Sequence, residues 1–203
     1  MSEKDRTILV GPTPCDDKRA FREERLKRVW ETLIASEKIE KMHLIVSLSL
    51  DLFREALSCY QNGAFMATIL VCGVALETLL YDIISAAKGK VRCIEGFLQN
   101  VEPNSDVYDM DFGRIIIEAK YRGLIDKEFE NRIRNLREMR NIVAHYAQKR
   151  HKLLSNQLEQ GHDPIASVSE GEWASDKDAY EVLEDTAVVI RDLIEKSHKI
   201  LCG

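Results

Sequence analysis

The distribution of apolar and polar residues along the chain predicts a helical protein. Apolar residues recur at helical spacing, and clean strand-like alternation is missing. No Asn-Gly or Asp-Gly pair reads as a hairpin turn, since the Asn62-Gly63 pair follows a helical stretch. The first helical stretch covers about residues 17–59. It is expected to form two helices that break near Ser36 and end at Asn62-Gly63.

The most apolar segment predicts a buried central helix. Residues 64–76 are apolar except for Thr68, and Glu77 and Asp82 interrupt the run that follows. This run is shorter than the roughly 20 residues that cross a bilayer. A core helix that ends near Ala87, before Lys88-Gly89-Lys90, is the better interpretation.

The remaining elements are also expected to be helices. They are short near residues 91–101 and 111–121, and longer at about 126–152 and 175–201. Gly123 is expected to end the second short helix, whereas Asp126 and Ser175 are expected to cap the long ones through their side-chain oxygens. Residues 155–174 read as a long loop, which we expect to cover a cleft. The fold class is therefore all-α, a multi-helix bundle of five to seven helices in a single domain, residues 1–203.

The charge, the cysteines, the N-terminus and the missing motifs exclude several classes of protein. The 203 residues carry a net charge of −5, which excludes a uniformly basic nucleic-acid coat. Five cysteines, an odd number without a C-x-x-C pair, are expected to be reduced thiols. The polar N-terminus lacks an apolar leader, so a cytoplasmic location is expected. No metal-binding motif or phosphate-cradling loop occurs, and we expect no cofactor and no metal.

One helix stands out by its charge. Residues 132–152 hold seven Lys/Arg and one acid, a net charge of +6, which leaves −11 for the remainder of the chain. Such a field suits a phosphate-bearing partner. The alternative is that these arginines pair with acids elsewhere in the molecule.

A helical wheel places Arg140 among the core-facing residues of this helix, on the same side as Leu136 and Val143. Because arginine keeps its proton, a buried one needs an acidic partner. Glu77 is the matching acid in the most apolar helix, so we expect the two to pair, either as part of a site or only to fix the helix register.

The same wheel gives two further strips. Arg134, Asn141 and His145 share a polar face, with Arg137 beside it. A second apolar strip contains Met139, Ile142 and Tyr146. A helix that is apolar on two sides is expected to contact its own core and a second subunit. By spacing alone, a lone histidine on a helix such as His145 is more often a surface or core residue than a catalyst.

These residues resemble a known superfamily. Residues 140–145 read R-N-x-x-x-H, which resembles the R-x(4–6)-H motif of the HEPN superfamily. The Tyr-Gln-Asn-Gly entry at residues 60–63 and the small-residue helix ending in Leu76-Glu77 are also similar to that superfamily. The resemblance covers about residues 42–150, with the N-terminal and C-terminal helices packed on this core.

The resemblance implies a homodimer that brings two motifs to a shared cleft and cleaves RNA without a metal. Arg140 and His145 would be the catalytic pair, Asn141 the adjacent polar helper and Glu77 a supporting acid. Arg134, Arg137, Lys149 and Arg150 would bind nucleic acid. Such proteins act in toxin–antitoxin or antiviral defence, so a separate antitoxin or regulator chain is an expected kind of partner, and a membrane is not. The alternative is an inactive HEPN-like module that binds protein or nucleic acid.

The motif has one geometric difficulty, since Arg140 and His145 lie about 140° apart on an ideal helix.

Overall fold

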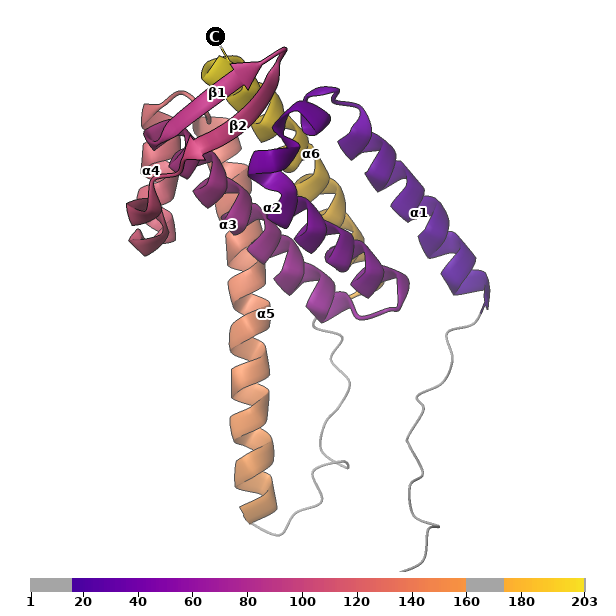
Figure 1. The fold of residues 1–203 in the computed structure, drawn as a ribbon. Coiled ribbons are helices and arrows are strands. Elements are labelled where there is room, and N and C mark those ends of the chain that lie inside the picture. Colours follow the sequence, from indigo (N-terminus) through magenta and orange to yellow (C-terminus); the bar gives the residue numbers. More distant parts are fainter. Residues whose placement is uncertain (1–15, 160–173, 203) are drawn as a thin grey trace, which may run out of the picture.

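The computed structural model describes residues 16–159 and 174–202, with side chains except at residues 16, 17, 100 and 146–159. The described residues form six α-helices, a two-stranded hairpin and one short 3-10 helix (Figure 1). In order, the elements are α1 (Asp16–Ile34), α2 (Lys38–Gln61), α3 (Phe65–Lys88), β1 (Lys90–Ile94), β2 (Phe97–Glu102), η1 (Ser105–Asp109), α4 (Phe112–Tyr121), α5 (Lys127–Glu159) and α6 (Asp176–Cys202).

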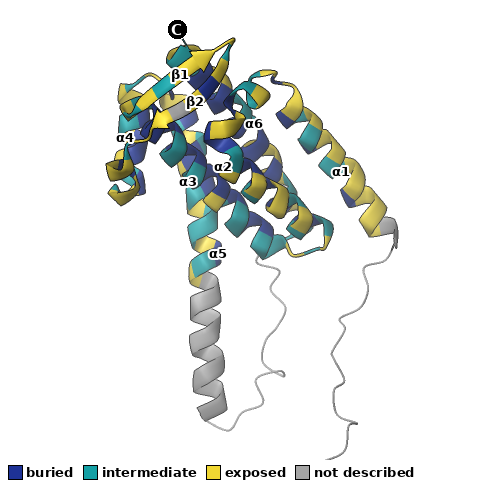
Figure 2. Cartoon of the chain, in the orientation of Figure 1, coloured by how far each residue is buried: buried dark blue, intermediate teal, exposed yellow. Residues whose placement is uncertain are grey.

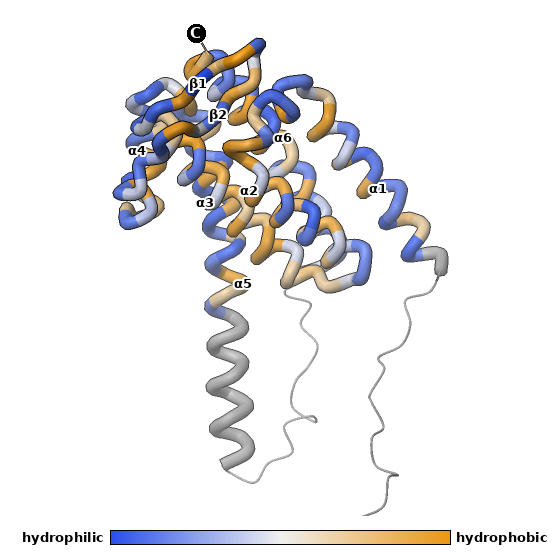
Figure 3. The backbone as a smooth tube through the Cα atoms, viewed as in Figure 1, coloured by the Kyte–Doolittle hydropathy of each residue, from blue (hydrophilic) through white to orange (hydrophobic). Residues whose placement is uncertain are grey.

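The core lies between α2, α3 and α6. Figure 2 shows buried residues concentrated where these helices face one another, and Figure 3 shows the matching concentration of hydrophobic residues. Phe53, Leu79 and Ile190 are fully buried, one from each helix. Burying a side chain of this size contributes about 1.5–3 kcal/mol, so the core contacts dominate the stability of the bundle.

The expected central helix is confirmed as α3. Its 24 residues are long and apolar enough to cross a membrane by length and composition. Half of its most apolar window is buried inside the bundle, where it packs against α2, α5 and α6. Core packing therefore accounts for the apolar composition.

Three of the predicted helix boundaries are also confirmed, at Asp126, Ser175 and Gly123. Asp126 Oδ1 accepts a hydrogen bond from the Phe129 amide at 2.9 Å. Ser175 and Asp178 cap α6 reciprocally, because each side chain accepts from the other residue's backbone amide. Gly123 follows α4 with φ of +71°, a conformation that favours glycine.

The prediction of a short helix near residues 91–101 is wrong. This segment is the antiparallel hairpin β1–β2, turning at Glu95-Gly96, where both residues have positive φ. Two successive positive φ values characterise the tight turns that suit hairpins. Leu98 is fully buried, and β2 packs on α2. Tertiary packing therefore selects strands here, and the strictly all-α prediction becomes a mostly helical bundle with one hairpin.

The α5 helix continues to Glu159, beyond its expected end near residue 152. The first part of the loop expected at residues 155–174 is therefore helical, and residues 160–173 lie outside the described part of the chain.

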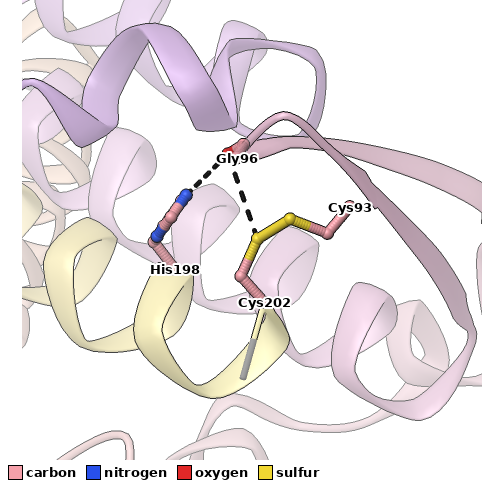
Figure 4. Close-up of a disulfide and its surroundings, with 4 residues drawn as sticks. All are labelled: Cys93, Gly96, His198 and Cys202. Atoms are coloured by element: carbon pink, nitrogen blue, oxygen red, sulfur yellow. Dashed lines mark hydrogen bonds between the residues drawn. A yellow bond between two sulfur atoms is a disulfide. The ribbon is translucent and has the colours of Figure 1, made fainter.

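The expectation of five reduced thiols is wrong for one pair. Cys93 of β1 forms a disulfide with Cys202 at the end of α6, 109 residues away, with Cα atoms 5.6 Å apart (Figure 4). His198 Nε2 donates to the Gly96 carbonyl at 2.7 Å, so the ring and the disulfide both attach the hairpin to α6. The expectation failed because it considered cysteine count and local spacing, whereas the hairpin brings distant cysteines together.

Cys59 and Cys72 are free, and burial raises the pKa of Cys72 to about 12. Cys15 lies outside the described residues.

Candidate functional site at the contact between α3 and α5

The candidate site lies where α5 packs against α3. Gly73 and Glu77 are four residues apart on α3, and therefore lie on the same helix face. Gly73 lets the stem of Arg140 approach closely, because a Cβ built at Gly73 would lie only 2.6 Å from Arg140 Cγ. A glycine is thus required for this packing of Arg140.

The predicted pair between Glu77 and Arg140 is confirmed. Arg140 Nη2 lies 3.3 Å from Glu77 Oε2, and Arg140 Nη1 donates to Asn141 Oδ1 at 3.3 Å. The side chains of Arg140 and Glu77 are 31% and 29% exposed. Solvent therefore screens the pair, which contributes about 0–1 kcal/mol to stability. Its clearer effect is to fix the position of the guanidinium.

Tyr81 extends this cluster by one helical turn, and the sequence analysis missed it. Its hydroxyl donates to the Met110 carbonyl at 2.6 Å. Burial raises the pKa of Tyr81, the negative charges of Glu77 and Asp111 raise it further, and Arg137 opposes them. The i, i+4 spacing from Glu77 could have indicated the shared face, but it could not indicate the link to Met110.

His145 is on α5, five residues after Arg140, and is exposed. Within the described residues no hydrogen bond joins it to Arg140, whose guanidinium is turned toward α3. The structure of one chain thus brings Glu77, Arg140 and Asn141 together and leaves His145 outside their cluster. An ideal helix already predicts this separation.

Several of the positive charges predicted on α5 have acidic partners. Arg132 pairs with Asp185 at 2.8 Å, and Arg134 pairs with Glu130 at 2.8 Å. The Arg137 guanidinium lies 5.3 Å from the centre of the Phe112 ring. The alternative of internal pairing is therefore correct for Arg132 and Arg134.

The side chains of Lys149 and Arg150, the other proposed nucleic-acid contacts, lie outside the described residues. Of the second apolar strip, Met139 packs against the core, whereas Ile142 is 48% exposed. The Tyr146 side chain also lies outside the described part. Val74, the residue after Gly73 on α3, is 38% exposed. Exposed apolar residues therefore occur on both helices that build the site.

Among the described residues, no three or more His, Cys, Asp or Glu side chains are grouped as a metal site would require. No protein-family model matches the chain, and neither does any curated protein or any solved structure. The chemistry of the site therefore rests on its own residues.

Proposed function

We propose that the protein is a metal-independent endoribonuclease of HEPN type, acting as a homodimer. The observation that carries the proposal is the positioning of Arg140 by Glu77 and Gly73, one residue before Asn141 and five before the exposed His145. The mostly helical bundle is compatible with this class of protein. A role in toxin–antitoxin or antiviral defence, and location in the cytoplasm, belong to the same proposal.

The proposed reaction uses the RNA's own 2′-hydroxyl as the nucleophile. His145 takes the hydroxyl proton, and the 2′-oxygen attacks the adjacent phosphorus. The bond from phosphorus to the 5′-oxygen then breaks, and a second histidine returns a proton to that oxygen. The products are a 2′,3′-cyclic phosphate and a 5′-hydroxyl. Histidine suits both roles because its ordinary pKa is near neutrality.

The homodimer supplies what one chain lacks. Each chain contributes one His145, so two copies provide one base and one acid. A second copy also brings another Arg140, whose charge and whose N–H groups not used by Glu77 and Asn141 stabilise charge on the phosphate oxygens. Ile142 and Val74 support this arrangement, since exposed apolar residues on both helices of the site provide contact area for a second chain.

The second candidate function is an inactive HEPN-like module that binds a protein or nucleic acid. The ion pairs of Arg132, Arg134 and Arg140 favour it, because each neutralises charge that would otherwise attract RNA.

Cleavage of labelled total RNA in EDTA separates the two functions. We expect cleavage by the wild type and at least a hundredfold loss in His145→Ala and Arg140→Ala. His43→Ala is the matched control, because His43 is also an exposed histidine but lies on α2. Equal activity in the wild type and His145→Ala would contradict the ribonuclease. Absence of cleavage throughout would favour the binding module.

A further inference from the structure

A cavity between the start of α1 and the start of α6 contains a buried positive charge without an acidic partner. The cavity has a volume of about 480 Å³, within the usual range for small-molecule sites. Arg22 lines it and is only 5% exposed. No ion pair joins Arg22 to an acid within the described residues. Because arginine stays protonated, burial without a counter-charge is costly and indicates a place for an anion.

The surroundings of Arg22 hold the guanidinium in place. Its Nε donates to the Gln61 carbonyl at 3.2 Å, at the C-terminal end of α2, where the helix dipole favours a cation. The Phe65 ring centre lies 6.0 Å from Arg22 Cζ. Nη2 is buried and has no hydrogen-bond partner among the residues that the structure describes. Buried guanidinium groups normally use each of their N–H donors. Nη2 can therefore donate a hydrogen bond to an oxygen atom of a ligand.

Asp176 supplies a complementary atom in the same cavity. Its Oδ2 accepts from Arg25 Nη1, which also donates to the Tyr60 hydroxyl at 2.8 Å. This network links α1, α2 and α6 and makes a fixed wall. Asp176 Oδ1 is buried and has no hydrogen-bond partner in the described part of the chain. Within the described residues, Arg22 and Asp176, which both line the cavity, thus have one unused donor and one unused acceptor, and a ligand with both kinds of group can satisfy both atoms.

The remaining lining residues indicate the class of ligand. Lys18 and Lys177 are exposed lysines at the cavity. Lys177 pairs with Glu181 at 3.6 Å, and Asp176 pairs with Arg25, so within the described residues Arg22 and Lys18 are the two lining cations without an acidic partner. An excess of two positive charges suits a phosphate dianion better than a carboxylate. Phe21 is 52% exposed and Phe65 is half-buried, and both line the cavity. Aromatic faces of this kind stack on planar rings.

We propose that this cavity binds a nucleoside monophosphate, with the phosphate at Arg22 and Lys18 and the base against Phe21. Lys18, Phe21 and Arg22 are spaced i, i+3 and i+4 on α1, so one helix face presents all three. The proposal is independent of the ribonuclease activity, because none of its residues belongs to the α3–α5 site.

Isothermal titration calorimetry with AMP, inorganic phosphate and adenosine tests the proposal. We expect AMP to bind the full chain at least tenfold more tightly than either phosphate or adenosine. Arg22→Gln is expected to abolish AMP binding. Lys18→Gln and Phe21→Ala change exposed residues and should each weaken it about tenfold. Lys27→Gln is the control, since Lys27 is an exposed lysine of α1 outside the cavity.

The outcomes separate clearly. Absence of binding by AMP would overturn the proposal, as would adenosine binding as tightly as AMP. AMP binding that is unchanged in Lys18→Gln and Phe21→Ala would place the nucleotide elsewhere and would also overturn it. These two variants decide the matter if Arg22→Gln fails to fold.

Discussion

The stem of Arg140 packs against Gly73 without space for a side chain between them. A Cβ built at Gly73 would lie 2.6 Å from Arg140 Cγ and 2.8 Å from Arg140 Cβ. Both contacts involve the part of the arginine next to its backbone, which cannot swing away as a flexible tip can. The distance between α3 and α5 at this point therefore depends on a glycine.

Gly73→Ala should separate the two helices and displace Arg140. Overpacking of this kind costs about 1–3 kcal/mol. The melting temperature should fall by about 2–4 °C for each kcal/mol in a chain of this size, and RNA cleavage should fall with it. Calorimetry and the RNA assay measure the two effects. Lys88→Ala, at the exposed end of the same helix, should be nearly neutral, and an equally neutral Gly73→Ala would contradict this packing argument.

The Glu77–Arg140 pair should contribute little to stability. Both side chains are about one-third exposed, so a double-mutant cycle with Glu77→Gln and Arg140→Gln should give a coupling energy below about 1 kcal/mol. Urea unfolding provides the four free energies, and added salt should reduce the coupling further. A coupling of several kcal/mol would instead indicate a pair kept to fix the helix register.

Reduction of the Cys93–Cys202 disulfide should destabilise the protein. The bond closes a loop across 109 residues, and chain-entropy arguments give about 2–4 kcal/mol for typical disulfides and somewhat more for long loops. The melting temperature should fall when dithiothreitol is added to the wild type. Cys93→Ser is the control, because it should already melt at the lower temperature and should not respond to dithiothreitol. Two free thiols at these positions in the purified protein, found by mass spectrometry without reductant, would contradict the bond.

The cap of α6 should make stability depend on acidic pH. Hydrogen bonds from the Ser175 amide and then its hydroxyl lower the pKa of Asp178, and Lys177 lowers it further. The carboxylate therefore stabilises the folded chain fully above the unfolded pKa of about 3.9. This contribution is lost as the pH falls through the lower folded pKa.

Asp178→Ala should accordingly lose about 1 kcal/mol at pH 7, a typical value for a helix cap. Its difference from the wild type should shrink as the pH is lowered toward 2. Urea unfolding at a series of pH values measures this difference, and a difference that stays constant with pH would show that the carboxylate charge is not involved.

The sequence predicts the helices of this protein well because most of them bury a regular apolar face. It also predicts the Glu77–Arg140 pair, since each residue is a lone charge on an otherwise apolar surface. The partners of Arg132 and Arg134 could not be assigned in advance. Asp185 is distant in the sequence, and many nearby acids compete with Glu130 for Arg134.

The hairpin could not be predicted from the sequence because its strands are short and mostly exposed. Leu98 is buried through contact with α2 rather than through a local pattern. The role of Gly73 could not be predicted for a similar reason, because a small residue in a helix does not indicate which side chain packs against it. The same limit applies to the cavity at Arg22, where the unpartnered atoms become visible only after α1 and α6 are placed together.

A mixing experiment tests the shared site most directly. Wild type and His145→Ala are mixed at different ratios and constant total concentration, and their subunits are allowed to exchange. RNA cleavage in EDTA is then followed. If each cleavage needs His145 from both chains, the rate should follow the square of the wild-type fraction, so an equal mixture should retain about one quarter of the activity. A rate proportional to the wild-type fraction, or no cleavage by the undiluted wild type, would contradict the account.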